Sequence, residues 1–340
     1  MKKLLFTLVL LVVIAGGAVA GIAAWFVYTP ASSSANEVVV EIPKGASSGQ
    51  IAALLARNGV VRDARMFKLY VRAVKAGSGL RAGEFLFRQD LTPAQVLDTL
   101  LHGEVVLHRI TVPEGFTAKE IAKIVGASGL GAEAEFLALT EDAAFAASLG
   151  VPAARLEGYL FPDTYSFPKN VGARGIAASM VARFKQAFTV ELQQAAQARG
   201  LTEHQAVTLA SIVEKETGDP SERGIIAGLY YNRLKISMKL EADPTIIYGM
   251  EMMGTYRGNI RRADIRNPAN QYSTYVIKGL PPGPIASPGG DALRAVAYPT
   301  SHEWLFFVAS GARGAHVFSK TYEEHARAVK KYQLRQRAQR

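Results

Sequence analysis

The most pronounced pattern in the chain is an apolar run near its start. Residues 4–28 contain no charged side chain, and they follow Lys2 and Lys3. At about 1.5 Å of rise per helical residue, such a run is long enough to cross a hydrocarbon layer of roughly 30 Å. The positive-inside rule then keeps both lysines in the cytoplasm. The pattern predicts a cytoplasmic stub and transmembrane anchor over residues 1–28, with the bulk of the chain extracytoplasmic.

A cleaved signal peptide is the alternative for this segment, because residues 18–20 read Ala-Val-Ala, like a signal peptidase site. Against cleavage, apolar residues continue to Val27, beyond the ~7–15 residues of a usual signal core. Trp25 and Tyr28 also suit the aromatic belt at a membrane interface. Residues 29–36, rich in serine and alanine, predict a flexible linker after the anchor.

Residues 40–52 and 110–122 share one pattern: an alternating apolar strand, a Pro-x-Gly turn, and a helix that opens with a capping box. Between the copies, the periodicity predicts helices over 64–74 and 92–101 and a strand over 83–87. Small α+β modules are therefore expected, and their pattern resembles LysM-type glycan-binding units.

The repeat gives one module over residues 37–105 and a second, with an aromatic and proline-rich junction, over 106–170. Ser47 lies in a G-x-S-x-G sequence, which is typical of a nucleophile elbow. Because the second copy carries Thr117 at the matching position, a helix cap is the better interpretation of Ser47. A long amphipathic helix is predicted over residues 173–199.

The composition narrows the classes of function that the chain can have. The chain has 340 residues, a net charge of +10 and no cysteine, so it has no disulfide framework and no thiolate metal site. The predicted topology places the positive charge away from nucleic acid and near the membrane surface or an anionic wall polymer. The six histidines form no metal-binding spacing, so neither a metal nor a cofactor is expected.

A helix over residues 203–217 carries the strongest candidate for catalysis. Leu209, Ile212 and Val213 form its inward stripe, and Glu216 continues that stripe. Burial and the negative end of the helix dipole both favour the protonated carboxyl, which is the form a general acid needs.

The alternative for Glu216 is a structural ion pair with Arg223 or Arg233. An acyl-enzyme of the penicillin-binding type is not expected, since Ser211 and Lys215 lie four residues apart instead of the three of S-x-x-K.

The octapeptide Ala-Ser-Ile-Val-Glu-Lys-Glu-Thr at residues 210–217 resembles the signature of the endolytic murein transglycosylases, the MltG or YceG-like family. Further blocks of the same family follow in order, at residues 157–165, 231–234, 240–249, 272–275 and 279–289. The resemblance runs from the anchor to about Lys330. It implies an anchored protein of α+β fold, with LysM-like modules and a mixed α/β catalytic domain over residues 171–340.

The resemblance also implies an activity. The family cleaves the β-1,4 bond between N-acetylmuramic acid and N-acetylglucosamine within peptidoglycan strands and leaves 1,6-anhydro ends. Its catalytic glutamate corresponds to Glu216, and its setting implies the inner membrane and peptidoglycan synthases as partners. Polar residues in the other blocks are candidate sugar ligands, with packing as their alternative role: Asn232 on a helix, and Asp243, Thr245, Tyr248, Tyr272, Thr274 and Tyr275 in loop-like segments.

Two other functions stay open at this stage. A non-catalytic scaffold that binds peptidoglycan for wall synthases has no need of an acid at the end of an apolar stripe. A soluble periplasmic hydrolase needs a second carboxylate to activate water. The transglycosylase needs one carboxyl group, because the sugar's own C6 hydroxyl is the nucleophile.

Overall fold

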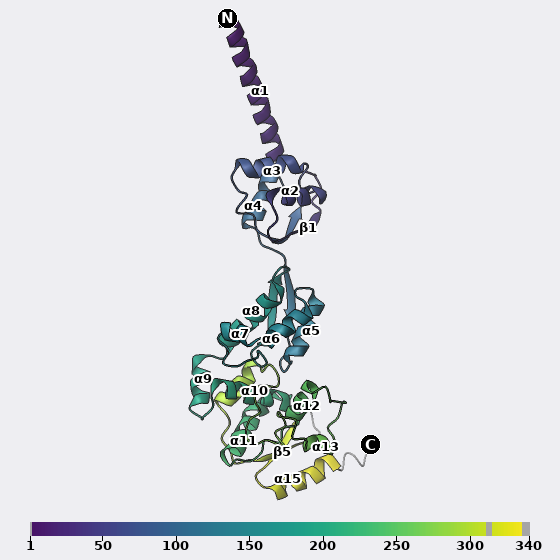
Figure 1. Ribbon diagram of the computed structural model, residues 1–340, viewed down its shortest axis with the longest axis vertical. Helices are drawn as coiled ribbons and strands as arrows, with labels where there is room; N and C mark the ends of the chain where they lie inside the picture. The colour runs from purple at the N-terminus through teal and green to yellow at the C-terminus, as the bar shows by residue number, and fades with distance from the viewer. Residues whose placement is uncertain (1, 311–314, 335–340) are drawn as a thin grey trace. The chain divides into compact units, whose positions relative to one another are not determined.

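The computed structural model describes residues 2–310 and 315–334, and Figure 1 labels most of its helices and some of its strands. The chain divides into two compact units. The first comprises Met1–Arg109 and Ser166–Val171, and the second comprises Ile110–Tyr165 and Gly172–Arg340. This division differs from the predicted domains, since most of the second predicted module lies in one unit with the predicted catalytic domain.

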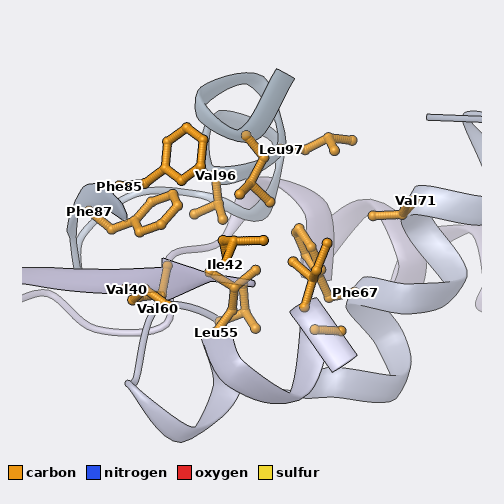
Figure 2. Close-up of a cluster of buried hydrophobic side chains, with 14 of the residues drawn as sticks. Val40, Ile42, Leu55, Val60, Phe67, Val71, Phe85, Phe87, Val96 and Leu97 are labelled. Atoms are coloured by element: carbon orange, nitrogen blue, oxygen red, sulfur yellow. The ribbon is translucent and has the colours of Figure 1, made fainter. Parts of the chain in front are cut away.

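The first unit contains the first α+β module. Its elements are β1 (Glu37–Ile42), α2 (Ser48–Arg57), α3 (Ala64–Ala73), β2 (Gly83–Arg88) and α4 (Pro93–His102). Strands β1 and β2 pair antiparallel, with Val40 opposite Phe85. Apolar side chains from both strands and from all three helices fill one core (Figure 2). The predicted helices and strand between the repeats are confirmed to within a residue or two.

The apolar helix α1 (Lys2–Tyr28) is long and apolar enough to cross a membrane. Its last turn is tied to the module, because Phe26 is buried in the module core and the Arg62 guanidinium lies 5.2 Å from the centre of the Trp25 ring. The predicted linker also contacts the module: Arg62 donates to the Pro30 carbonyl at 2.9 Å.

The elements of the second copy begin, like those of the first, with a strand and a helix, but three helices instead of two precede the second strand. They are β3 (Leu107–Thr111), α5 (Ala118–Ser128), α6 (Glu133–Thr140), α7 (Ala143–Ser148) and β4 (Thr164–Pro168), and β3 pairs with β4. The predicted capping boxes are present at the start of both α2 and α5, so Ser47 is a helix cap, as expected.

The rest of the second unit is mainly helical. Its elements are α8 (Gly172–Ala187), α9 (Val190–Gln197), α10 (Glu203–Glu216), the short turn η1 (Pro220–Glu222), α11 (Arg223–Lys235), α12 (Asp243–Met252), α13 (Arg262–Ile265), α14 (Gly290–Ala297), β5 (Phe306–Ala309), β6 (His316–Ser319), α15 (Tyr322–Val329) and η2 (Lys330–Leu334). Helix α10 is central: residues 206–213 are all buried, and α9, α11, α12 and α14 pack around it.

Two expectations need correction, and one feature was not predicted. The single helix predicted over 173–199 is two helices, because Thr189 caps α9 by accepting from the Leu192 amide. The segment from Asp243 to Tyr248 is helical, since Pro244 in the first turn starts a helix instead of breaking one. The antiparallel hairpin of β5 and β6 was not predicted.

Candidate active site

Glu216 is the last residue of α10, and it borders a cavity of about 340 Å³. The predicted stripe leads to it, since Leu209, Ile212 and Val213 have no exposed surface. The cavity is lined by residues of the β5–β6 hairpin and of α15, and by four further polar side chains: Arg233, Glu241, Asp243 and Tyr275. The apolar face of α10 therefore presents its one terminal carboxyl group to an open cavity.

The surroundings of Glu216 favour its protonated form. Burial is the largest cause and, with the negative charge of Asp243, raises the pKa of Glu216 to about 7. The hydroxyl of Tyr230 on α11 donates to Glu216 Oε1 at 2.9 Å, and this bond, together with the charge of Arg233, opposes the rise. At neutral pH the carboxyl group is thus poised between acid and base.

The alternative role of Glu216 as a structural ion pair is not supported. Among the described residues, neither Arg223 nor Arg233 forms an ion pair with it. Arg233 instead donates to main-chain carbonyl groups, at 2.7 Å to both Leu305 and Leu240.

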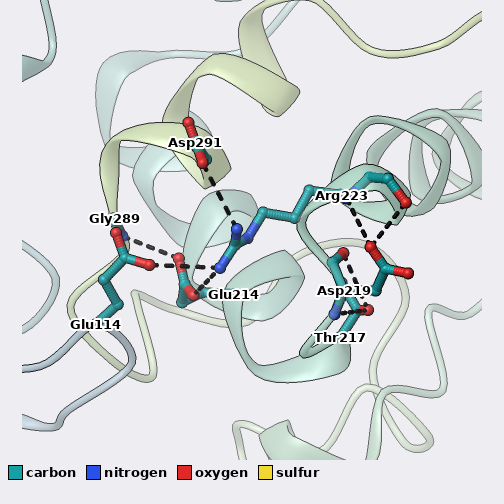
Figure 3. A network of polar contacts seen from close by, with 8 residues as sticks. Glu114, Glu214, Thr217, Asp219, Arg223, Gly289 and Asp291 are labelled. Atoms are coloured by element: carbon teal, nitrogen blue, oxygen red, sulfur yellow. Dashed lines mark hydrogen bonds and ion pairs between the residues drawn. The ribbon is translucent and has the colours of Figure 1, made fainter. Parts of the chain in front are cut away.

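Arg223 belongs to a separate network beside α10 (Figure 3). Its guanidinium contacts Glu214 at 2.9 Å, Glu114 at 3.4 Å and Asp291 at 3.8 Å. Glu214 also accepts from the Gly289 amide at 3.0 Å. The network therefore uses Glu214, the neighbour of Glu216 in the Glu-Lys-Glu sequence, to hold the end of α10.

The turn of the second repeat copy joins this network. Lys215 donates to the Gly115 carbonyl at 3.1 Å, and the amide of Gly115 donates to the Ser287 carbonyl at 2.9 Å. Contact is close enough that a Cβ at Gly289 would lie 1.9 Å from Glu114 Oε1. The second module thus supports the last turn of α10, on which Glu216 stands.

Ser211 has a structural role. Its hydroxyl donates to the Thr208 carbonyl at 2.7 Å and accepts from the Ile285 amide at 3.0 Å. The bond to Ile285 fastens the proline-rich loop of residues 280–288 to α10. This contact gives the loop a scaffold role beside α10.

The candidate sugar ligands divide into four groups. Asp243 and Tyr275 line the Glu216 cavity, and the Tyr275 hydroxyl donates to Asp243 Oδ1 at 2.9 Å. Asn232 does not line it. Its amide donates to the carbonyls of His302 at 2.8 Å and Trp304 at 3.1 Å, so it holds the chain leading to β5.

Thr245 and Thr274 are fully buried, and their hydroxyl oxygens lie 2.9 Å apart. Thr274 also accepts from the Ala242 amide at 2.9 Å. Both threonines therefore fasten α12 to the 270–275 segment and do not reach a ligand themselves. Packing, the alternative for these positions, is what the geometry supports.

Tyr248 and Tyr272 form a pair elsewhere on the same two segments. Their ring centres lie 4.8 Å apart, with 60° between the ring planes. The Tyr248 hydroxyl donates at 3.1 Å to Glu157, a buried carboxyl group that the sequence analysis did not single out. The sequence contains a signal that could have identified Glu157, because it is the only charged residue in the apolar stretch 156–162.

The second unit is thus an α+β fold that presents one candidate general acid in a polar cavity. A family model confirms the resemblance drawn from the sequence. The YceG-like model matches residues 40–331, and the chain belongs to this family.

Two similar proteins carry names that agree with this family assignment. The endolytic murein transglycosylase of Bacillus subtilis strain 168 is 29% identical over 318 residues, which is 88% of this chain and 86% of that protein. The protein of the same name from Streptococcus pneumoniae strain R6 is 31% identical over 329 residues, or 88% of this chain. The chain spans only 59% of the pneumococcal relatives' length.

A solved structure is similar as well. The crystal structure of a YceG-like protein from Listeria monocytogenes superimposes with a TM-score of 0.58 at 30% identity. The alignment covers 86% of this chain and 99% of that one. The likeness extends over nearly all of the solved chain.

Proposed function

We propose that this protein is an endolytic lytic transglycosylase of peptidoglycan, with Glu216 as its catalytic acid and base. The observation that carries the proposal is the position of Glu216, whose pKa is about 7 and which borders an open polar cavity without an ion-pair partner among the described residues. The names of the relatives from Bacillus subtilis and Streptococcus pneumoniae support the substrate class.

The reaction needs one carboxyl group in two protonation states. Protonated Glu216 gives its proton to the glycosidic oxygen as the bond from that oxygen to C1 of the muramic acid breaks. The C6 hydroxyl of the same sugar then bonds to C1, and its proton returns to the Glu216 carboxylate. Because the attack is intramolecular, proximity supplies much of the rate. No water enters, and the product is a 1,6-anhydro end.

The neighbours of Glu216 have complementary roles in this scheme. The Tyr230 hydroxyl stabilises Glu216 while it is ionised, between the two proton transfers. Asp243, oriented by Tyr275, brings negative charge to the cavity in which the sugar becomes cationic. The same charge raises the pKa of Glu216, so it also favours the acid form at the start.

The wider setting belongs to the proposal too. Helix α1 serves as a single-pass anchor in the inner membrane, with its N-terminus cytoplasmic and the rest of the chain periplasmic, as its length and apolar surface suggest. The strand–helix–helix–strand order of the first module suits a LysM-like glycan-binding unit. Peptidoglycan synthases are the proposed protein partners.

The test is digestion of purified sacculi by the full-length protein in detergent, followed by mass analysis of the glycan ends. Wild type is expected to release 1,6-anhydro ends, and Glu216→Gln none. The matched control is Glu203→Gln, which deletes a carboxyl group in the first turn of the same helix. This variant should keep cleaving.

Three outcomes would contradict the proposal. Cleavage by Glu216→Gln would remove Glu216 from the chemistry. Ends heavier by about 18 Da, the mass of water, would show hydrolysis, and Asp243 would then be the base that activates the water. Binding of sacculi without any cleavage by wild type would favour the non-catalytic scaffold.

A further inference from the structure

A second buried carboxyl group lies outside the Glu216 cavity. Glu157 borders two cavities of its own, of about 390 Å³ and 320 Å³. Tyr248 lines the first of them and Tyr272 the second. The Glu157 side chain sits between the two cavities with 9% of its surface exposed.

Glu157 has hydrogen-bond donors around it but no compensating charge. The Ala118 amide lies 3.0 Å from Oε1 and 3.2 Å from Oε2, and the Tyr248 hydroxyl lies 3.1 Å from Oε2. Among the described residues no cation pairs with it, since the nearby Arg155 is bound to Glu141 at 2.8 Å. Burial outweighs the hydrogen bonds and raises the pKa of Glu157 to about 7.

A purely structural role for Glu157 is the competing explanation. Ala118 is the first residue of α5, so the carboxyl group also caps a helix N-terminus. A carboxylate selected only for capping is stabilised in its ionised form, which lowers its pKa. The raised pKa and the two bordering cavities are not required by capping.

We infer that Glu157, Tyr248 and Tyr272 form a saccharide subsite that binds the acetamido group of an N-acetylated sugar, away from the bond that is cut. This inference rests on the proposed function. A protonated carboxyl group is complementary to an acetamide, because its hydroxyl donates to the amide carbonyl and its own carbonyl accepts from the amide N–H. The two tyrosine rings provide apolar surface for the sugar.

The subsite is separate from the site of cleavage but shares its framework. Asp243 at the Glu216 cavity and Tyr248 at Glu157 lie five residues apart on α12, about 7.5 Å along the axis and roughly 140° around it. The partner segment follows the same path, from Tyr275 beside Asp243 to Tyr272 beside Tyr248. A polymeric substrate extends beyond its scissile bond and can occupy both sites, whereas a single sugar cannot.

Binding is measured by calorimetry on the full-length Glu216→Gln protein in detergent. That background prevents cleavage and removes the other carboxyl group with a pKa of about 7. The probes are a chitin tetrasaccharide and the matching cellulose tetrasaccharide, which carries hydroxyl groups in place of the acetamido groups. The chitin probe should bind about tenfold more weakly at about pH 8 than at about pH 6, because the protonated fraction of Glu157 falls by that factor.

The variant Glu157→Gln separates binding from structure. Glutamine keeps one donor and one acceptor but does not titrate, so affinity for the chitin probe should become independent of pH. Several other charged or titratable groups surround the two cavities: Lys119, Glu141, Arg155, His204, Tyr248, Glu251 and Tyr272. If the pH dependence survives in Glu157→Gln, one of these groups causes it and the inference is overturned.

Further outcomes are equally decisive. Equal binding of both probes would mean that no acetamido group is recognised, and Glu157 would then be only a helix cap. Should Glu157→Gln fail to fold, Tyr272→Leu is the second variant, and it must lose affinity for the chitin probe at least severalfold. A missing anhydro product from wild type, with chitin binding intact, would refute the proposed function and leave the subsite standing.

Discussion

Tyr230→Phe tests the role of the hydrogen bond to Glu216 most directly. The substitution removes one hydroxyl group and preserves the ring, which is fully buried and packs edge-on against Phe307 at 6.4 Å between ring centres. The lost bond, 2.9 Å long, favours the ionised carboxylate. Its removal must therefore raise the pKa of Glu216 further.

The size of the effect follows from the bond that is lost. A hydrogen bond to a charged group contributes about 1.5–3 kcal/mol, and about 1.4 kcal/mol corresponds to a tenfold change in an equilibrium constant. The pKa of Glu216 should then rise from about 7 to roughly 8–9. Because the proposed reaction starts from protonated Glu216, the alkaline limb of the activity profile should move to higher pH by the same amount.

The assay is the initial rate of anhydro-end formation at low substrate, followed across pH for wild type and variant. Tyr231→Phe is the matched control, because Tyr231 is the next residue on α11 and its hydroxyl donates to the Val296 carbonyl at 2.9 Å instead. The control should leave the limb where it is. An alkaline limb that stays in place in Tyr230→Phe, or moves to lower pH, would refute the assignment of Glu216 as the titrating acid.

Three further predictions concern stability. Wild type should lose stability as pH rises from about 4.5 to about 7, because the native Glu216 carboxyl stays protonated while that of the unfolded chain ionises. Glu216→Gln lacks this loss, so it should gain on the order of 3 kcal/mol relative to wild type over that range. Thermal unfolding against pH measures the difference. Arg223→Leu leaves buried Glu214 without its cation and should cost about 3–5 kcal/mol in chemical unfolding. Gly249→Ala should cost about 1–3 kcal/mol, since the added Cβ would lie 1.8 Å from Asn270 Oδ1, and circular dichroism melts report it.

The Arg223 and Gly249 predictions each have a matched comparison. Glu114→Gln removes the half-exposed member of the Arg223 network and should cost less than about 1 kcal/mol. Gly290→Ala adds a methyl group where no atom lies within 4 Å, so it should be neutral. A loss at Gly290 as large as that at Gly249 would mean that the collision with Asn270 is not the cause.

Local signals in the sequence predict much of this fold. The capping boxes of α2 and α5 are set by residues three apart, and the stripe on α10 repeats with the helical period, so both can be read from short windows. The break at Thr189 was missed because apolar periodicity continues through it, and only the hydrogen bond to the Leu192 amide reveals the cap. The spacing of apolar residues therefore does not reveal a helix cap when the apolar pattern continues on both sides of it.

The site was predictable in part for a related reason. Glu216 stands out because it extends an apolar stripe, whereas the partner of its carboxyl group, Tyr230, is an ordinary buried tyrosine until the packing of α10 against α11 is known. Tyr275 lines the Glu216 cavity, whereas Tyr248 and Tyr272 lie beside Glu157. This arrangement depends on the helical turn of α12, a segment for which the sequence predicts a loop. Which side chains share a cavity is a property of tertiary packing.

The turns of the two repeat copies differ in what they contact. In the first, the turn around Gly45 remains at the surface and borders a cavity of its own. In the second, the equivalent turn around Gly115 is pinned against α10 and the loop at Ser287. Removal of residues 1–106 would leave β3 intact, whereas a cut that also removes the turn around Gly115 would take away the support of the last turn of α10. The second copy is therefore a structural part of the unit that holds Glu216, and a transplanted unit must include it.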